Sequence, residues 1–313
     1  MRIVTRGSAL ALWQANYVRD ALVGAGIADP ITVVVRTTGD RVQDVPLARI
    51  GDRGLFTREV DDALLDGRAD LAVHSLKDVP TVLPDGLGIV AILERSDPSD
   101  VLVARAGELG RLHSLPPGAR VGTSSLRRRA QLAALRPDLD IVDLRGNVDT
   151  RIARVHEGVV DAAILARAGL LRLGRAKEAS DVLSAPEWLP AVGQGALALV
   201  MRSDDPAGAR VAALEHPPTR AAVTAERSFL RRLEGGCQVP IGALAVWRSG
   251  AIELQGAVFS LQGDIRIAAG AIGTDADPEG LGERLAERLL DDGADRVLEA
   301  VRAAAGAPEV PAP

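Results

Sequence analysis

The chain contains one cysteine, Cys237, which follows the pair Gly235-Gly236 at the end of a predicted helix. Glycines adopt positive φ easily and commonly end helices, so we expect the thiol on a turn rather than on a packed helix face. An exposed thiol is a possible point of covalent attachment. The negative end of the helix dipole disfavours a thiolate, so alkylation here requires nearby arginines or an unusually strong electrophile. The alternative is that a lone cysteine is simply a small buried apolar residue.

A second set of side chains with chemical potential consists of arginines that follow predicted strands. They are Arg6, Arg127, Arg128, Arg145 and Arg151. In open α/β sheets, ligands bind at the carboxyl ends of the strands, where helix N-termini direct backbone N–H groups toward them. Ser8 and Ser124 are expected to cap two of these helices. Because guanidinium groups bind carboxylates or phosphates in a bidentate manner, this pattern predicts a polyanionic ligand. For the run 127–129, a solvated helix face is an equal alternative.

Lys77 and Asp78 form a third candidate group, at the end of the predicted strand 70–74. All but two of the 37 basic residues are arginine, and one of the two lysines directly precedes this aspartate. A carboxylate kept ionised by neighbouring arginines can stabilise a cation that forms on a substrate. An aspartate close to a proline turn is, however, usually a cap or turn residue.

Composition excludes several classes of function. The net charge of −5, the seven aromatic residues and the absence of a recognition motif argue against nucleic-acid binding. The four histidines are scattered and no cysteine pair exists, so no metal site is expected. No apolar run approaches the length of a membrane span, and the N-terminal segment does not resemble a signal peptide. We therefore expect a cytoplasmic protein with no membrane partner.

The elements that would position these residues alternate between strand and helix. Strands are predicted at 2–5, 31–37, 70–74 and near Val101, Val121, Ile141 and Ala163, and helices at 8–23, 55–66, 124–135 and 147–158. The pattern predicts two α/β units with mainly parallel sheets. Further along, we expect a strand within 194–202 that rejoins an earlier sheet, a helix at 218–233, an antiparallel meander at 242–273, and a final helix at 278–305 broken near Gly293.

Six motifs occur in one order and carry a family resemblance. They are Arg6-Gly7-Ser8, Gly54-Leu55-Phe56-Thr57-Arg58-Glu59, His74-Ser75-Leu76-Lys77-Asp78-Val79-Pro80, Leu144-Arg145-Gly146-Asn147-Val148, Val192-Gly193-Gln194-Gly195-Ala196 and Leu233-Glu234-Gly235-Gly236-Cys237. Over nearly its whole length, the chain resembles the hydroxymethylbilane synthase family, also called porphobilinogen deaminases.

The resemblance implies an α/β fold of two periplasmic-binding-protein-like lobes, followed by a C-terminal α+β domain with an antiparallel sheet that carries the cysteine. The expected limits are 1–95 with 195–214 for the first lobe, 100–190 for the second, 217–306 for the C-terminal domain, and 307–313 for a disordered tail.

The resemblance also implies a transferase that condenses four porphobilinogen molecules head to tail, each with loss of ammonia, and releases a linear tetrapyrrole by hydrolysis. The growing chain would be anchored on a dipyrromethane cofactor joined by a thioether to Cys237. The enzyme would act as a monomer, with porphobilinogen as its small-molecule partner. The competing class is a non-catalytic solute-binding protein of the same two-lobe design, in which neither Cys237 nor Asp78 would have a role.

Residue roles follow from the same resemblance. Asp78 and Lys77 would be catalytic, the cofactor would be held by Cys237, Arg127, Arg128, Ser125, Asp78 and Lys77, and substrate carboxylates by Arg6, Ser8, Arg145, Arg151, Arg172 and Arg58. Two positions depart from the family pattern. Arg58 replaces a usual lysine, which changes reach and hydrogen-bond geometry. The segment 197–202 lacks the acidic residue expected before its arginine.

Overall fold

The computed structural model describes residues 1–37, 57–105, 110–233 and 239–305, and their strands form three sheets. The first sheet has the order β2-β1-β3-β10-β4. The first lobe comprises β1 (Arg2–Arg6), α1 (Ala9–Gly24), β2 (Ile31–Val35), α3 (Arg58–Leu65), β3 (Leu71–Ser75), the 3-10 turn η2 (Leu76–Asp78), β4 (Leu87–Ile92), β10 (Leu197–Arg202) and α7 (Gly208–Ala212). The prediction that a strand near residue 200 rejoins an earlier sheet is confirmed by β10.

Alternation along β1 explains how this sheet is covered on both faces. Successive strand residues point to opposite faces, so Ile3 packs with Val18 of α1, whereas Val4 packs with Leu64 of α3. All four side chains are fully buried. The strand is therefore a central element whose end, at Arg6, is fixed in place.

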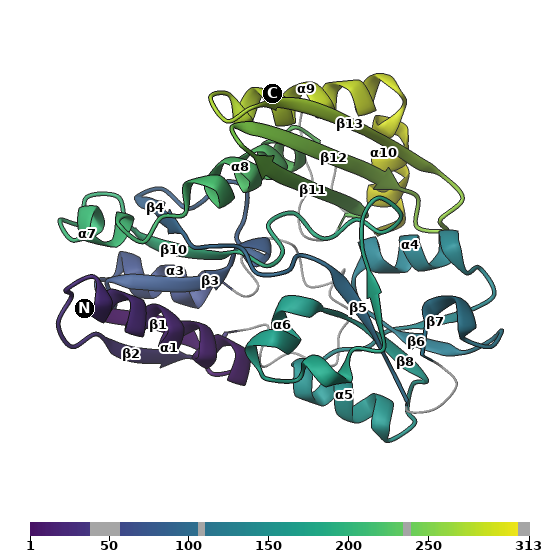
Figure 1. Cartoon of the computed structure of the whole chain (residues 1–313), viewed down its shortest axis with the longest axis horizontal. Coiled ribbons are helices and arrows are strands. Elements are labelled where there is room, and N and C mark those ends of the chain that lie inside the picture. The colour runs from purple at the N-terminus through teal and green to yellow at the C-terminus, as the bar shows by residue number, and fades with distance from the viewer. Residues whose placement is uncertain (38–56, 106–109, 234–238, 306–313) are drawn as a thin grey trace.

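The second lobe repeats this arrangement with the sheet order β7-β6-β8-β5-β9. It comprises β5 (Asp100–Ala104), η3 (Leu112–Ser114), β6 (Arg120–Gly122), α4 (Leu126–Leu135), β7 (Asp140–Val142), α5 (Val148–His156), β8 (Ala162–Ala166), α6 (Arg167–Arg172), η4 (Ala176–Glu178) and β9 (Asp181–Leu183). Figure 1 shows the two lobes side by side, the first in purple and blue and the second in teal.

The expectation of mainly parallel sheets is confirmed, with one exception in each sheet: four of the five strands run in one direction, and β10 in the first lobe and β5 in the second run against them. In the first lobe β1 pairs in parallel with β2 and β3, but β10 runs antiparallel to β3 and β4. In the second lobe β5 runs antiparallel to β8 and β9. The reason is that the chain crosses between the lobes twice. Strands β5 and β10 each come from the other lobe and begin beside the carboxyl end of a neighbouring strand. The first residue of β5, Asp100, pairs with Ala166 at the end of β8, and the first residue of β10, Leu197, pairs with Ser75 at the end of β3.

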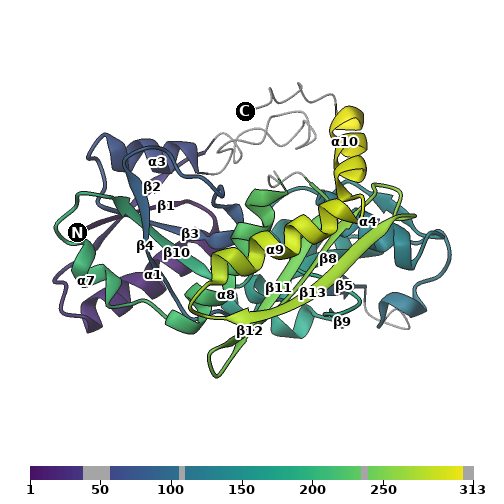
Figure 2. The same ribbon diagram turned by 90° about the horizontal axis from the view of Figure 1, so that it is seen from above.

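The C-terminal domain is an antiparallel sheet covered by helices. It comprises α8 (Pro217–Arg232), β11 (Ile241–Arg248), β12 (Ala251–Phe259), β13 (Arg266–Thr274), α9 (Pro278–Asp291) and α10 (Ala294–Ala305). Figure 2 shows α9 running alongside the strands of this sheet. The predicted meander is confirmed, and the predicted helix break falls at Gly293, whose φ of +96° no helical residue adopts. Two α/β lobes followed by an α+β domain were therefore predicted correctly.

This third domain packs on both lobes. Val223 of α8 lies in one apolar cluster with Leu76 and Val79 of the first lobe. Phe259 of β12 lies in another with Ala130 of α4 in the second lobe. Helix α8 therefore contacts the segment that contains Lys77 and Asp78. The predicted disordered tail and the cysteine turn lie outside the described residues.

Candidate active site

The candidate site lies where the two lobes face each other, at the carboxyl ends of their strands. Arg6 ends β1, Asp78 follows β3 through η2, and Arg145 follows β7. The amino end of β5, at Asp100, meets the same edge. The expectation that the strand ends collect the charged residues is therefore fulfilled by the fold itself.

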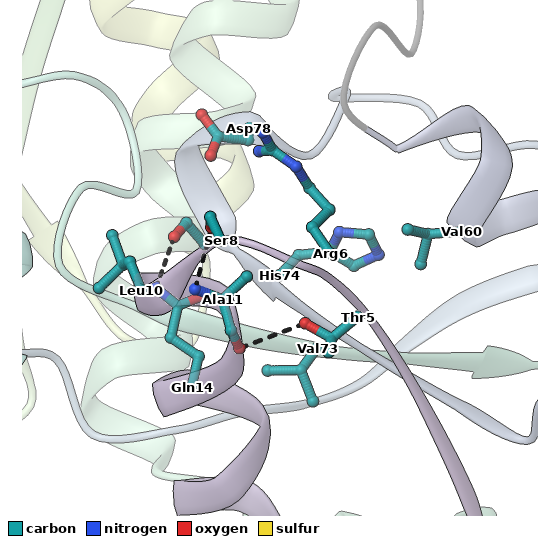
Figure 3. Close-up of a pocket in the computed structure, with 11 residues that line it drawn as sticks. Thr5, Arg6, Ser8, Leu10, Ala11, Gln14, Val60, Val73, His74 and Asp78 are labelled. Carbon is teal, nitrogen blue, oxygen red and sulfur yellow. Dashed lines mark hydrogen bonds between the residues drawn. The ribbon is translucent and has the colours of Figure 1, made fainter. Parts of the chain in front are cut away.

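Asp78 is the last residue of η2, and its side chain is partly buried. Upstream, the Leu76 N–H donates to Ala196 O at 3.0 Å, which ties the turn to the segment before β10. A cavity of about 70 Å³ lies beside it, lined among others by Arg6, Ser8 and Gln14. Figure 3 shows the Arg6 guanidinium directed toward Asp78, with Ser8 lower in the same cavity. The carboxylate therefore lies at the edge of a polar cavity next to a cation.

Ser8 and Asn147 cap their helices as their residue types predict. Ser8 Oγ accepts a hydrogen bond from Ala11 N at 3.3 Å, and Asn147 Oδ1 accepts one from Thr150 N at 2.8 Å. For α4 the predicted cap was wrong by one residue. Ser125 Oγ accepts from Arg128 N, whereas the Ser124 hydroxyl donates to Leu144 O at 2.9 Å. The reason is that Ser125 is still extended, so the helix begins one residue later, and the Ser124 hydroxyl binds the segment that follows β7.

Lys77 is held beside Asp78 by the segment that returns from the second lobe. Its Nζ donates to Gln194 Oε1 at 3.3 Å. The pKa of Lys77 is lowered to about 8. Burial is the main cause, Arg128 and Arg127 also lower it, and Asp78 and Asp100 oppose the shift. These influences mean that the five charged groups share one poorly solvated region.

Arg127 and Arg128, from the first turn of α4, are buried and share one carboxylate. Arg127 Nη2 lies 2.8 Å from Asp100 Oδ2, and Arg128 Nη2 lies 2.7 Å from Asp100 Oδ1. Burial alone would raise the pKa of Asp100, but Arg127 and Arg128, assisted by hydrogen bonds from Arg128 and Trp188, hold it below its usual range. Asp100 is completely buried, so this ion-paired group is a fixed part of the structure.

Arg127 and Arg128 differ in the number of N–H donors that remain available to a ligand. Arg127 also donates from Nη1 to Leu189 O at 2.6 Å, and only 4% of its surface is exposed. Arg128 donates from Nη1 to Ile164 O at 2.8 Å. Among the described residues, its Nε is one of the few buried side-chain nitrogens without a partner. An unsatisfied buried donor is costly, so Arg128 is suited to receive an anionic acceptor.

Arg145 and Arg151 complete the cluster. The pKa of Arg151 is lowered to about 10, mainly by burial and also by Arg128 and Arg145. Its Nε donates to Gly146 O at 2.8 Å. Gly146 has a φ of +111°, a conformation that a side chain would strain. Lys77, Arg128, Arg145 and Arg151 repel one another in a poorly solvated region. A ligand with several negative charges would relieve this repulsion.

Two predicted site residues lie apart from this cluster. Arg172, at the end of α6, donates from Nη2 to Gly195 O at 2.6 Å and lies 6.0 Å from the centre of the Trp13 ring. Burial lowers its pKa to about 10. It thus connects the second lobe to the first. Arg58 begins α3 with an exposed side chain, so it is not one of the buried arginines around Asp78.

Sequence reasoning missed Asp100 and Gln194. Gln194 Nε2 donates to Pro98 O at 2.7 Å and to Asp100 Oδ1 at 2.9 Å, while its Oε1 receives Lys77. Gln194 lies in one of the six family motifs, and its place there indicates a functional position, although the motif alone does not define its role. Asp100 gave no local signal, since its partners are distant in the sequence.

No group of metal-binding side chains is arranged to hold a metal ion within residues 1–37, 57–105, 110–233 and 239–305. In the same part of the chain, none of the helices has the length and hydropathy needed to span a bilayer.

The family models and the relatives that are similar in sequence agree on one family. The family model "Porphobilinogen deaminase, dipyromethane cofactor binding domain" matches residues 1–210, and the model of the porphobilinogen deaminase C-terminal domain matches residues 220–291. A porphobilinogen deaminase of Moorella thermoacetica is 52% identical over 309 residues, covering 98% of each chain. One of Desulforudis audaxviator is 52% identical over 303 residues, covering 96% of this chain and 97% of that one. Among solved structures, the VFT2 domain of Bordetella pertussis BvgS aligns with a TM-score of 0.40 and 15% identity, over 68% of this chain and 84% of that chain.

Proposed function

The chain belongs to the porphobilinogen deaminase family, and we propose that the arginine cluster around Asp78 is where its condensation reaction takes place. Members of this family are transferases that join four porphobilinogen molecules head to tail, with loss of ammonia at each step, and release hydroxymethylbilane by hydrolysis. The observation that carries the assignment is that Asp78 lies within electrostatic reach of Lys77 and Arg151, which in turn lie close to Arg128 and Arg145.

The cluster fits the covalent dipyrromethane of this family. The bound group supplies the pyrrole carbon that starts the chain, and it brings several carboxylates with it. Arg128 would receive one of these on its unpartnered Nε, and Lys77 would receive another. Each such contact relieves the mutual repulsion of the buried cations. We assign the attachment to Cys237, which lies outside the described residues.

Asp78 would act on the substrate itself. Ammonia leaves with the electrons of the C–N bond, so positive charge develops on the pyrrole and its methylene carbon. A carboxylate at hydrogen-bond distance accepts the pyrrole N–H and offsets this charge. Because Asp78 is fixed by η2 and partly shielded from water, its stabilisation needs little reorganisation during the reaction.

The remaining site residues would divide the carboxylates among them. Arg6 and Ser8, beside the cavity at Asp78, would hold the incoming porphobilinogen, while Arg145 and Arg151 would hold carboxylates of the growing chain. The hydroxyl oxygen of Ser125 accepts the capping hydrogen bond of α4, and the hydroxyl hydrogen would be donated to a carboxylate of the ligand. Arg127 is proposed to act through Asp100 by holding Arg128 in place. Arg58 would contribute only long-range charge.

We further propose domain limits of 1–95 with 195–214, 100–190 and 217–306. The enzyme is proposed to work as a monomer, as the family resemblance implies, and in the cytoplasm, where the single thiol stays reduced until it is alkylated.

The direct test is product formation. Mixing the purified protein with porphobilinogen, then acidifying and oxidising the mixture, should give the colour of a porphyrin in proportion to time and enzyme. A protein that binds porphobilinogen but forms no coloured product would instead be a solute-binding protein, and the proposed function would be wrong.

A pH dependence follows from Lys77. Below its pKa of about 8 the amine is charged and can hold a carboxylate of the dipyrromethane to which porphobilinogen is added, and above that pH it becomes neutral. Since kcat/KM reports groups of the free enzyme, kcat/KM for porphobilinogen should fall as the pH rises through about 8. Lys77→Arg stays charged, so its profile should lack this step. Identical profiles for the two proteins would contradict the assignment.

The arginines should not be interchangeable, and mass spectrometry can separate them. Arg128→Gln removes the buried donor near Asp78, so we expect little cofactor on the purified protein and little turnover. Arg172→Gln breaks a contact between the lobes, so we expect a full cofactor load but accumulation of enzyme-bound intermediates at one ring number. The control is Arg129→Gln, a partly exposed neighbour on the same helix, which should behave as wild type. The same mass pattern in all three variants would refute separate roles.

A further inference from the structure

A side chain of the C-terminal domain forms two hydrogen bonds with the backbone directly after Asp78. Arg227 of α8 donates from Nη1 to Val79 O at 3.0 Å and from Nη2 to Pro80 O at 2.6 Å. The two carbonyls belong to the first and second residues after the aspartate. A guanidinium has a rigid, planar fork, so two donors on consecutive carbonyls fix both the position and the direction of this short stretch of chain.

The turn is thus held from two sides. Before Asp78, the backbone of Leu76 is bound to Ala196 in the first lobe, and Val79 N closes η2 on Leu76 O at 3.1 Å. After Asp78, Arg227 binds from another domain. Val79 is also buried against Val223, four residues earlier on α8. Asp78 therefore projects from a turn whose exit is attached to α8 by both polar and apolar contacts.

Helix α8 is a rigid platform for this contact. Glu226, next to Arg227, is completely buried and pairs with Arg95, with Nη1 to Oε1 at 2.6 Å. Its Oε2 also accepts from Gly193 N at 2.7 Å, and its Oε1 from Ala245 N at 2.8 Å. One carboxylate thus binds both segments that cross between the lobes and strand β11. Precise placement of a functional group requires this kind of rigid support.

The geometry points to Arg227 as a positioning residue that holds Asp78 at the distance required for charge stabilisation and couples it to the domain that carries Cys237. This inference rests on the role proposed above for Asp78. A displacement of about 1 Å at a reacting group can cost about a hundredfold in rate. Arg227 touches carbonyls rather than substrate, so its loss should lower kcat and leave the binding of porphobilinogen carboxylates unchanged.

The experiment compares Arg227→Gln, Arg227→Lys and Arg220→Gln in the cofactor-loaded enzyme. Arg220 is the matched control, since it is also on α8 and donates to a backbone carbonyl of the first lobe, Ile89 O at 3.2 Å, but away from the Asp78 turn. We expect kcat of Arg227→Gln to fall about 10-fold to 100-fold with KM within about 2-fold. Arg227→Lys, which retains a cationic donor, should recover part of the rate, and Arg220→Gln should keep it.

A double-mutant cycle with Asp78→Asn decides whether Arg227 acts through the aspartate. The rate of adding the first porphobilinogen is followed by intact mass over hours, which makes slow variants measurable. In the Asp78→Asn background, Arg227→Gln should cost less than about 3-fold. An equal loss in both backgrounds, or equal losses for Arg227→Gln and Arg220→Gln, would overturn the inference while leaving Asp78 in its role. If Asp78→Asn itself keeps normal turnover, the proposed role of Asp78 fails, and this inference falls with it.

Discussion

Asp78→Asn should lower turnover by at least about a hundredfold while the protein stays folded and keeps its cofactor. The amide has the size and shape of the carboxylate but no charge, so it cannot offset the positive charge that develops as ammonia leaves. The side chain is partly exposed at the end of η2, and the turn is held by backbone contacts of Leu76 and Val79. Its replacement should therefore leave the packing intact. The measurement is the steady-state rate of hydroxymethylbilane formation.

Two controls make this result interpretable. The intact mass must show the same cofactor load as wild type, and the thermal unfolding midpoint must be unchanged. Asp62→Asn provides a matched control, because it removes a carboxylate from an exposed position on α3, away from the strand ends. Near-normal turnover of cofactor-bearing Asp78→Asn would show that another group stabilises the cation.

Cys237→Ala should abolish turnover completely. Cys237 is the only cysteine, so no other thiol can take over the attachment. Without a thioether the growing chain has no anchor, and the arginine cluster alone cannot hold it through successive additions. We expect the purified variant to have the mass of its sequence and to form no product at any porphobilinogen concentration. Wild-type protein from the same preparation is the control, and an active variant without cofactor would contradict the assignment.

Much of the fold could be predicted because the local signals are strong. The β-branched run of β2 and the turn signals between β11, β12 and β13 define strands without knowledge of the rest of the chain. Strand direction was less accessible. The antiparallel entry of β5 and β10 depends on the chain crossing twice between the lobes, which is a property of the whole topology.

The meeting of charged residues at the strand ends could be predicted, whereas the partners of these residues could not. Arginines after strands meet at one edge because the strand ends do. Which arginine is available to a ligand depends on Asp100, which lies on β5 and pairs with residues of α4. The pairing of Asp100 with these arginines follows from the order of strands in the sheet, and the sequence around Asp100 does not indicate it. Arg127 and Arg128 are neighbours of the same type, yet only the structure distinguishes the donors that each has already used.

The partners of Arg172 could not be predicted from the sequence either. From the sequence it is an arginine after a strand, like the others. In the structure its guanidinium binds Gly195 O and lies over Trp13, which connects the second lobe with the first. Such a contact depends on three segments far apart in the sequence, and it links a predicted carboxylate-binding residue to the relative position of the lobes.

The most direct test of the account is the intact mass of the wild-type protein before and after brief exposure to porphobilinogen. Before exposure, the protein should be heavier than its sequence by two linked pyrrole units. After exposure, further masses should appear, separated by one porphobilinogen less one ammonia and numbering at most four. The species with four additions should return to the starting mass, because hydrolysis releases hydroxymethylbilane and leaves the dipyrromethane on the protein. A protein that has only its sequence mass and nevertheless forms hydroxymethylbilane would contradict assembly on a dipyrromethane at Cys237.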